Sequence, residues 1–193
     1  MPEIKDLRTI KTLSTIRNAL TQLLLEKKFK NITIDEIAKI GVINRSTFYL
    51  HYHDKYDLLD DLVNQKIKKV IDTIQAEPHI THGKLDYQMF SNDLELSLDV
   101  IASEQHFYQF MLNDEEDLGL RKKIEDALFD KLSQSFPVKT VVERDLLLKI
   151  ISTIYVSVIT WWLNKNMVYS TQYMAAELVK FFKLGTANII DPS

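Results

Sequence analysis

The segment Thr33–Tyr52, which reads TIDEIAKIGVINRSTFYLHY, constrains the fold of this chain more than any other stretch. Thr33 is a good N-cap, and Glu36 completes a capping box just ahead of an apolar pair, which fixes the start of a short helix. Gly41 interrupts the apolar pattern, and Asn44 can cap a second short helix with its side-chain oxygen. Two short helices joined by about three to four residues have the dimensions of a helix-turn-helix.

The second short helix carries an unusual concentration of hydrogen-bonding side chains and aromatic rings. Ile43, Phe48 and Leu50 can face the core of this unit, which leaves the polar side chains at the surface. A helix whose first turn is rich in donors fits one that touches base edges in the major groove of DNA. A solvated helix on an ordinary all-helical domain is the alternative. The polar and aromatic residues are Arg45, Ser46, Thr47, Tyr49, His51 and Tyr52.

The run Ile37–Leu58 follows the pattern I-A-x-x-G-V-I-N-R-S-T-F-Y-x-H-Y-x-D-K-x-x-L. This pattern resembles the DNA-binding signature of the tetracycline-repressor (TetR) family of bacterial transcription regulators, and the resemblance extends from Thr33 to about Leu62. The family usually has Ala-Gly at the turn, where this chain has Gly41 and Val42. Because a β-branched residue at positive φ is strained, we expect the turn to shift so that Gly41 absorbs the bend.

The resemblance implies roles for single residues. The lysine and the tyrosine that Lys55 and Tyr49 match in the family hold DNA phosphates, so we expect the same roles here. Arg45 and Thr47 are expected to read bases, Arg45 through a bidentate fork to O6 and N7 of guanine. The expected DNA-binding residues are Thr33, Asn44, Arg45, Ser46, Thr47, Tyr49, His51, Tyr52 and Lys55.

The distribution of charge supports a nucleic-acid partner, although the net charge of -3 alone argues against one. Residues 1–53 contain nine Lys/Arg against five Asp/Glu, and the rest of the chain carries the acidic excess. A basic N-terminal part on an acidic body is the pattern expected when only one part of a protein meets phosphate. The acidic run Asp114–Asp117 is predicted to be a solvated turn.

Composition argues against an enzyme. The chain has no cysteine and only four glycines, which stand alone, so neither a thiol nucleophile nor a phosphate-cradling loop can be built. No convergent acid, base or nucleophile set is visible, so we predict no catalytic residue and no cofactor. His79 and His82 lack a third ligand, and we predict no metal site. The lack of cysteine and of an apolar leader fits a cytoplasmic protein.

Apolar residues at steps of three and four predict an all-α fold, because no alternation of strand type is sustained. We expect an N-terminal three-helix helix-turn-helix domain at 1–53, a linking helix at 54–76 capped by Asp54, and a larger C-terminal helical domain for dimerisation and regulation at 77–193. The longer predicted helices are about Leu7–Glu26, Asp54–Gln75, Tyr87–Ser103, Gln105–Leu112, Leu118–Ser135, Leu146–Leu163 and Tyr173–Leu184.

The helix at Leu146–Leu163 is apolar on nearly every side and must be buried by more than one neighbour. Thr140 and Glu143 are expected to form its capping box. A membrane span is the rival explanation, but Lys149 and several hydroxyl side chains interrupt the run, and we expect no membrane association. Together with the final helix it predicts a homodimer in which two helix pairs form a four-helix bundle, as the resemblance also implies.

Control of the regulator is the least constrained expectation. Members of the family typically bind a small apolar molecule in the C-terminal domain, which implies a repressor that leaves a palindromic operator when the effector binds. The segments FYQFMLND and WWLNKNMVYS resemble a subgroup from low-GC Gram-positive bacteria, some of whose members are activators controlled by a protein partner. A helical interaction protein without DNA binding is a further alternative. Candidate effector contacts, chosen from side-chain character alone, are His106, Phe110, Met111, Tyr155, Trp161 and Trp162.

Overall fold

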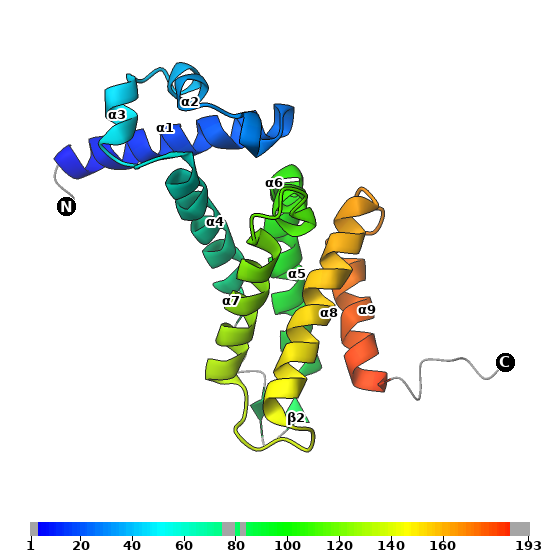
Figure 1. The fold of residues 1–193 in the computed structure, drawn as a ribbon. Coiled ribbons are helices and arrows are strands. Elements are labelled where there is room, and N and C mark those ends of the chain that lie inside the picture. The colour runs from blue at the N-terminus through cyan, green and yellow to red at the C-terminus, as the bar shows by residue number, and fades with distance from the viewer. Residues whose placement is uncertain (1–3, 75–79, 82–83, 186–193) are drawn as a thin grey trace. The chain divides into compact units, whose positions relative to one another are not determined.

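The computed structural model describes residues 4–74, 80–81 and 84–185, and the chain divides into two compact units (Figure 1). Unit 1 contains the chain up to Lys66 together with the segment Asp114–Leu118. Unit 2 contains Ile67–Asn113 and the chain from Gly119 onward. The division falls inside a helix that we expected to link two domains, and a short segment from the second half of the chain belongs to unit 1.

Unit 1 is a small helical unit in which α2 packs against both α1 and α3. Its core consists of fully buried apolar side chains from each helix, among them Leu20 of α1, Ile37 of α2 and Phe48 of α3. The elements are α1 (Ile4–Glu26), the 3-10 turn η1 (Phe29–Asn31), α2 (Ile34–Ile40), α3 (Arg45–Tyr49) and the first part of α4 (Lys55–Ile71).

Local capping explains where two of these helices begin. The hydroxyl of Thr33 accepts the backbone N–H of Glu36, and the Glu36 carboxylate accepts the backbone N–H of Thr33 at 3.0 Å, so the predicted capping box is confirmed. Asp54 caps α4 as predicted, since its carboxylate accepts the backbone N–H groups of Tyr56 and Asp57. Asn44 stands at the N-cap of α3, but its side chain makes no capping bond.

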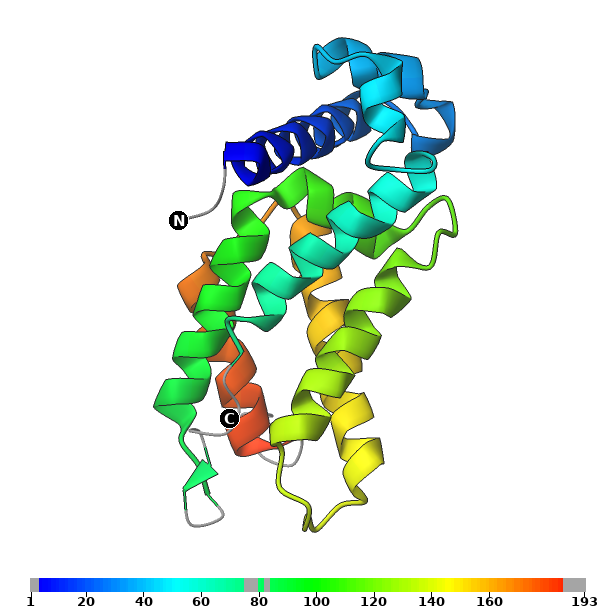
Figure 2. The same cartoon turned by 90° about the vertical axis from the view of Figure 1, so that its left-hand side faces the viewer.

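Unit 2 is a helical bundle in which α5 packs on α9 and α7 packs on α8, as Figures 1 and 2 show. The shorter α6 contacts α5, α7 and α8. A two-stranded antiparallel pair, with Ile80 opposite Leu85, is a small addition to an otherwise all-helical fold and agrees with the predicted fold class. The elements are β1 (Ile80–Thr81), β2 (Lys84–Leu85), α5 (Tyr87–Ser103), α6 (Gln105–Asn113), α7 (Leu120–Ser135), α8 (Arg144–Asn164) and α9 (Thr171–Leu184).

The N-cap of α8 is Glu143, three residues after the predicted N-cap Thr140. Thr140 is not the N-cap, because its hydroxyl bonds to the Val142 carbonyl, and Glu143 instead accepts the N–H groups of Asp145 and Leu146. By length and composition α8 is the one helix among the described residues that is able to cross a membrane. It nevertheless packs against α6 and α7 and buries residues along its whole length, as the core helix of a bundle does.

Candidate nucleic-acid interface

The turn between α2 and α3 bends at Val42 and not at Gly41, so our expectation for this turn was wrong. Gly41 lies in the right-handed region at φ -72°, whereas Val42 has φ +50° and is 90% exposed. A Cβ added to Gly41 would lie 3.2 Å from the carbonyl oxygen of Ile37 and 3.4 Å from Cγ2 of Thr15. Because Gly41 has no side chain, α1 and the turn can approach each other closely there. Its neighbour Val42 adopts the left-handed conformation.

Helix α3 is anchored by one ring and presents its other side chains outward. Phe48 is fully buried and makes edge-on or tilted ring contacts with Tyr49 and Tyr52. Leu50, which we expected in the core, is largely exposed. The exposed or partly exposed side chains of this region are Asn44, Arg45, Ser46, Thr47, Tyr49 and His51. The first turn of α3 thus offers donors to a ligand outside the protein.

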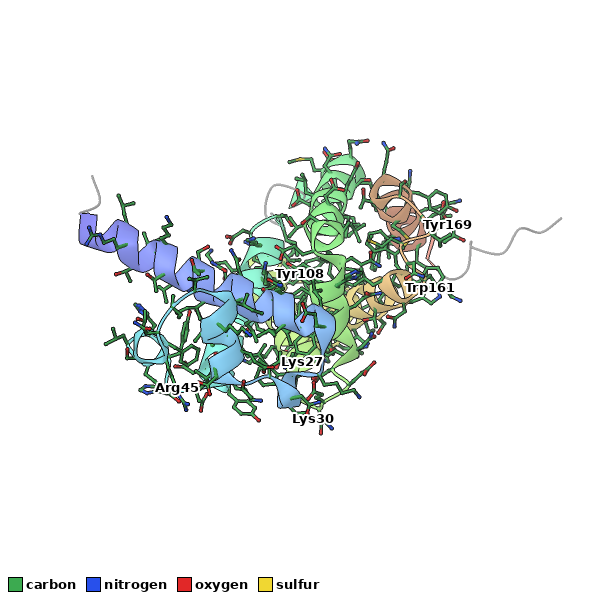
Figure 3. All side chains as sticks on the ribbon, turned by 90° about the horizontal axis from the view of Figure 1, so that it is seen from above. Lys27, Lys30, Arg45, Tyr108, Trp161 and Tyr169 are labelled. Carbon is green, nitrogen blue, oxygen red and sulfur yellow. The ribbon has the colours of Figure 1, made fainter. Side chains whose placement is uncertain are left out.

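Arg45 is held by two partners within unit 1, and Figure 3 shows where it lies. Its Nη1 donates to Oδ1 of Asp35 at 3.2 Å, and its Nη2 donates to the hydroxyl oxygen of Tyr49 at 3.3 Å. The guanidinium carbon also lies 5.6 Å from the centre of the Tyr49 ring. The bond to Tyr49 and the charge of Asp35 raise the pKa of Arg45, and the guanidinium is a permanent cation, as in every arginine.

Lys55 has all of its donors occupied. Its ammonium donates to the carbonyl oxygens of Phe29, Lys30 and Ile32 at 2.9, 2.9 and 2.8 Å, and it lies 4.8 Å from the centre of the Phe29 ring. An ammonium has three N–H groups, so a phosphate would have to displace one of these carbonyls. The phosphate contact implied by the resemblance thus competes with a structural role that the sequence did not indicate.

Tyr52 is a core residue and not a surface donor, since its exposed fraction is 5%. Its hydroxyl donates to Asp61 of α4, which also accepts from Nε of Arg17 at 2.8 Å. Burial and the bond to Asp61 raise the pKa of Tyr52. Burial favours a higher pKa for Asp61, but the bonds from Arg17 and Tyr52 outweigh it and lower that pKa. These bonds join α1, α4 and the residues that follow α3, a structural role that the expectation of a DNA contact did not include.

Thr33 also has an internal role. Its side chain is exposed, but its hydroxyl donates to Oε2 of Glu36 at 2.9 Å while accepting the backbone N–H of the same residue. A contact to DNA through this hydroxyl would therefore disturb the capping box of α2.

The six candidate effector contacts do not share one environment. Met111, Tyr155 and Trp162 are buried, Phe110 is partly exposed, and His106 and Trp161 are exposed. Several have structural partners, which side-chain character alone did not indicate: the Tyr155 hydroxyl donates to Oγ of Ser97 at 2.8 Å, and the Trp162 indole N–H donates to the Tyr169 carbonyl at 2.9 Å. Trp161 stacks on the ring of Tyr169 at the end of α8 (Figure 3). No cluster of three possible metal ligands occurs in the described part of the chain, and His79 and His82, considered in the sequence analysis, lie outside it.

The acidic turn after α6 makes a contact that the sequence analysis did not predict. Both carboxylate oxygens of Glu116 accept backbone N–H groups of η1, from Phe29 at 2.6 Å and from Lys30 at 2.9 Å. The acidic run was predicted to be a solvated turn, and its composition gives no sign of a partner 86 residues away along the chain. Glu116 and Lys55 thus hold the N–H and the C=O groups of the same short turn.

Comparisons of the sequence with known proteins found two similar entities. A TetR family model described as "Transcriptional regulator C-terminal region" matches residues 88–184. An uncharacterized HTH-type transcriptional regulator, YxbF of Bacillus subtilis (strain 168), is 22% identical over 190 residues, which are 96% of this chain and 48% of that protein. The chain therefore spans about half the length of this curated relative.

Solved structures share the fold. A putative TetR-family transcriptional regulator from Syntrophomonas wolfei is similar with a TM-score of 0.73 at 21% identity, covering 96% of this chain and 100% of that one. The regulator FadR from Bacillus subtilis, solved in complex with stearoyl-CoA, is similar with a TM-score of 0.65 at 19% identity, covering 87% of this chain and 96% of that one.

Proposed function

Because this chain belongs to the TetR family of transcriptional regulators, we propose that it binds double-stranded DNA as a homodimer and places α3 in the major groove of a palindromic operator. The observation that carries the proposal is the exposure of Asn44, Arg45 and Ser46 at the start of a helix that Phe48 anchors to the core. This regulator acts in the cytoplasm, where it meets the chromosome, and it is not an enzyme.

The exposed side chains divide into base readers and phosphate binders. Arg45 and Thr47 read base edges, and Arg45 selects guanine. Asn44, Ser46, Tyr49 and His51 contact the phosphate backbone; the Tyr49 hydroxyl accepts from Arg45 and so keeps its own hydrogen to donate. Thr33, Tyr52 and Lys55 act indirectly, by holding α2, the end of α3 and η1 in place.

The homodimer is supported by apolar side chains that unit 2 leaves exposed on α8 and α9. On α8 the exposed residues recur at steps of three and four, and the large apolar ones among them are Leu146, Ile150 and Trp161, with the polar Thr153 and Ser157 in between. On α9 it includes Tyr173 and Phe181. Two such helix pairs related by a two-fold axis would cover these faces in a four-helix bundle.

We further propose that the protein is a repressor that a small apolar effector releases from DNA. The FadR neighbour was solved with stearoyl-CoA, whose acyl chain is apolar although its coenzyme A part is charged, and this supports an effector that carries a long apolar chain. Fluorescence anisotropy of protein on operator DNA, with and without stearoyl-CoA, tests the proposal: release is expected at micromolar effector. If acyl-CoA leaves binding unchanged, and deletion of the gene lowers transcription of its neighbours, the protein is an activator.

DNA binding is tested with labelled fragments that flank the gene, at salt concentrations from 50 to about 200 mM. Each phosphate contact adds about 0.9 to the slope of log K against log salt, so several contacts give a steep decline. The variant R45A should lose base preference, while K39A, which removes an exposed cation of α2, should keep it. Binding with a flat salt dependence would refute the proposal.

A further inference from the structure

We propose that Asp35 is a positioning residue for base reading, which holds the guanidinium of Arg45 in the orientation that meets a base. This inference rests on the proposed function and extends it to a residue that does not itself touch DNA. The pattern of donors on α3 did not indicate it, because Asp35 lies on α2, ten residues before its partner.

Asp35 and Tyr49 restrict the long side chain of Arg45 from two sides. Nη1 of Arg45 lies 3.2 Å from Oδ1 and 3.4 Å from Oδ2 of Asp35, and Nη2 donates to the Tyr49 hydroxyl. A guanidinium has five N–H groups, so at least two remain for the O6 and N7 acceptors of guanine. Holding the fork in advance reduces the conformational entropy that is lost when the base is bound.

The pair contributes orientation rather than stability. The side chains of Arg45 and Asp35 are 58% and 70% exposed, and ion pairs this exposed contribute little to the free energy of unfolding. A carboxylate beside the DNA-reading helix also weakens attraction to phosphate. Asp35 is therefore expected to lower the affinity for DNA in general while raising the discrimination between the correct and the wrong base.

These opposite effects define the experiment. Dissociation constants of the full-length dimer are measured for the operator, for an operator with the guanine opposite Arg45 replaced, and for random DNA. D35A should bind random DNA more tightly and lose about tenfold in the ratio between operator and substituted operator. D35E, which keeps the carboxylate, should recover most of the ratio. E26A, which removes an exposed carboxylate from the end of α1, should leave the ratio unchanged.

A double-mutant cycle separates orientation from charge. In the R45A background, D35A should no longer change the ratio, because there is no guanidinium left to orient. Circular dichroism is used to check that each variant is folded. If D35A is unfolded, D35N, which keeps the shape of the side chain, is measured in its place. If D35A tightens all three DNAs equally and the ratio stays constant, Asp35 acts by charge alone and the inference is wrong. If the wild-type protein binds none of the fragments, the proposed function itself fails.

Discussion

Val42 occupies a backbone conformation that β-branched side chains avoid. At φ +50° its Cβ crowds the backbone, and a left-handed residue other than glycine costs about 1–2 kcal/mol. The side chain is 90% exposed, so no burial of apolar surface offsets this cost. The strain lies in the turn of the helix-turn-helix and is present before any DNA is bound.

The substitution V42G should therefore raise the free energy of unfolding by about 1 kcal/mol, because the strain that is relieved exceeds the added entropy of the unfolded chain. Urea denaturation of the two proteins measures the difference. The control is G41A, in which the new Cβ meets the Ile37 carbonyl at 3.2 Å, and stability should not rise. A V42G protein no more stable than wild type would show that the turn is not strained.

Glu36 gives the stability of α2 a defined dependence on pH. Its hydrogen bond from Lys27 and its bonds to Thr33 lower its pKa from 4.5 to about 2. A carboxylate with a depressed pKa stabilises the folded state fully above its unfolded value and loses this contribution as pH falls through the folded value. The stabilisation by Glu36 is thus complete above pH 4.5 and disappears toward pH 2.

The variant E36Q tests this, since a glutamine retains the capping-box geometry without the charge. Its melting temperature should lie below that of wild type at pH 6, and the gap should close as pH is lowered from 4.5 to 2. The control E26Q removes an exposed charge on α1 and should show a constant gap. A constant gap for E36Q as well would show that its ion pair is not formed in solution.

Residues whose role depends on near neighbours were predictable from the sequence. Thr33 with Glu36, and Asp54 with the first turn of α4, act over two to three positions, and the structure has both. Tyr52 and Lys55 were not predictable, because burial and distant partners decide their roles. The partner of Tyr52 is Asp61, and the carbonyls that hold Lys55 come from a turn that lies 23 to 26 residues earlier.

At the scale of elements, η1 is a three-residue turn whose backbone groups are held from two directions. Glu116 accepts its N–H groups, and Lys55 donates to its carbonyls. A turn this short forms few hydrogen bonds of its own, so its geometry depends on these two charged side chains. Because η1 connects α1 to α2, both charges help to fix the angle at which the helix-turn-helix begins.

The substitution E116A should lower the free energy of unfolding of unit 1 by about 2 kcal/mol, since it removes two hydrogen bonds to a charged acceptor. Hydrogen exchange of the Phe29 and Lys30 amides should become faster. The neighbouring E115A is a matched control: Glu115 reaches Lys28 only at 3.9 Å with both side chains exposed, and its loss should have almost no effect. Unchanged exchange in E116A would contradict the contact.

Helix lengths were predicted well where the apolar pattern continues to the end, as in α5, whose bounds agree with the expectation at both ends. Helix α8 lacks the expected capping box, because Glu143, expected as the acidic member of the box, is itself the N-cap and the Thr140 hydroxyl bonds to the Val142 carbonyl. Prediction from sequence thus succeeded for the existence of helices and failed for the residue that caps this one.

At the scale of the whole molecule, the exposed face of α8 is the interface that we propose for the homodimer. The substitution I150E places a charge on a side chain that is 43% exposed, so it should leave the protomer folded and prevent dimerisation. The matched control is L96E on α5, where the leucine is 53% exposed. Analytical ultracentrifugation should find a monomer for I150E and a dimer for L96E. A dimeric I150E protein would place the interface elsewhere.

The two units of this protein are not consecutive along the chain, because Asp114–Leu118 lies in unit 1 between two helices of unit 2. The backbone therefore crosses from one unit to the other three times, and a single proteolytic cut cannot separate them intact. A fragment that stops at Lys66 would lack the carboxylate that binds the amides of Phe29 and Lys30. A chimaera that exchanges the DNA-binding units of two such regulators would therefore have to include Asp114–Leu118 along with the first 66 residues.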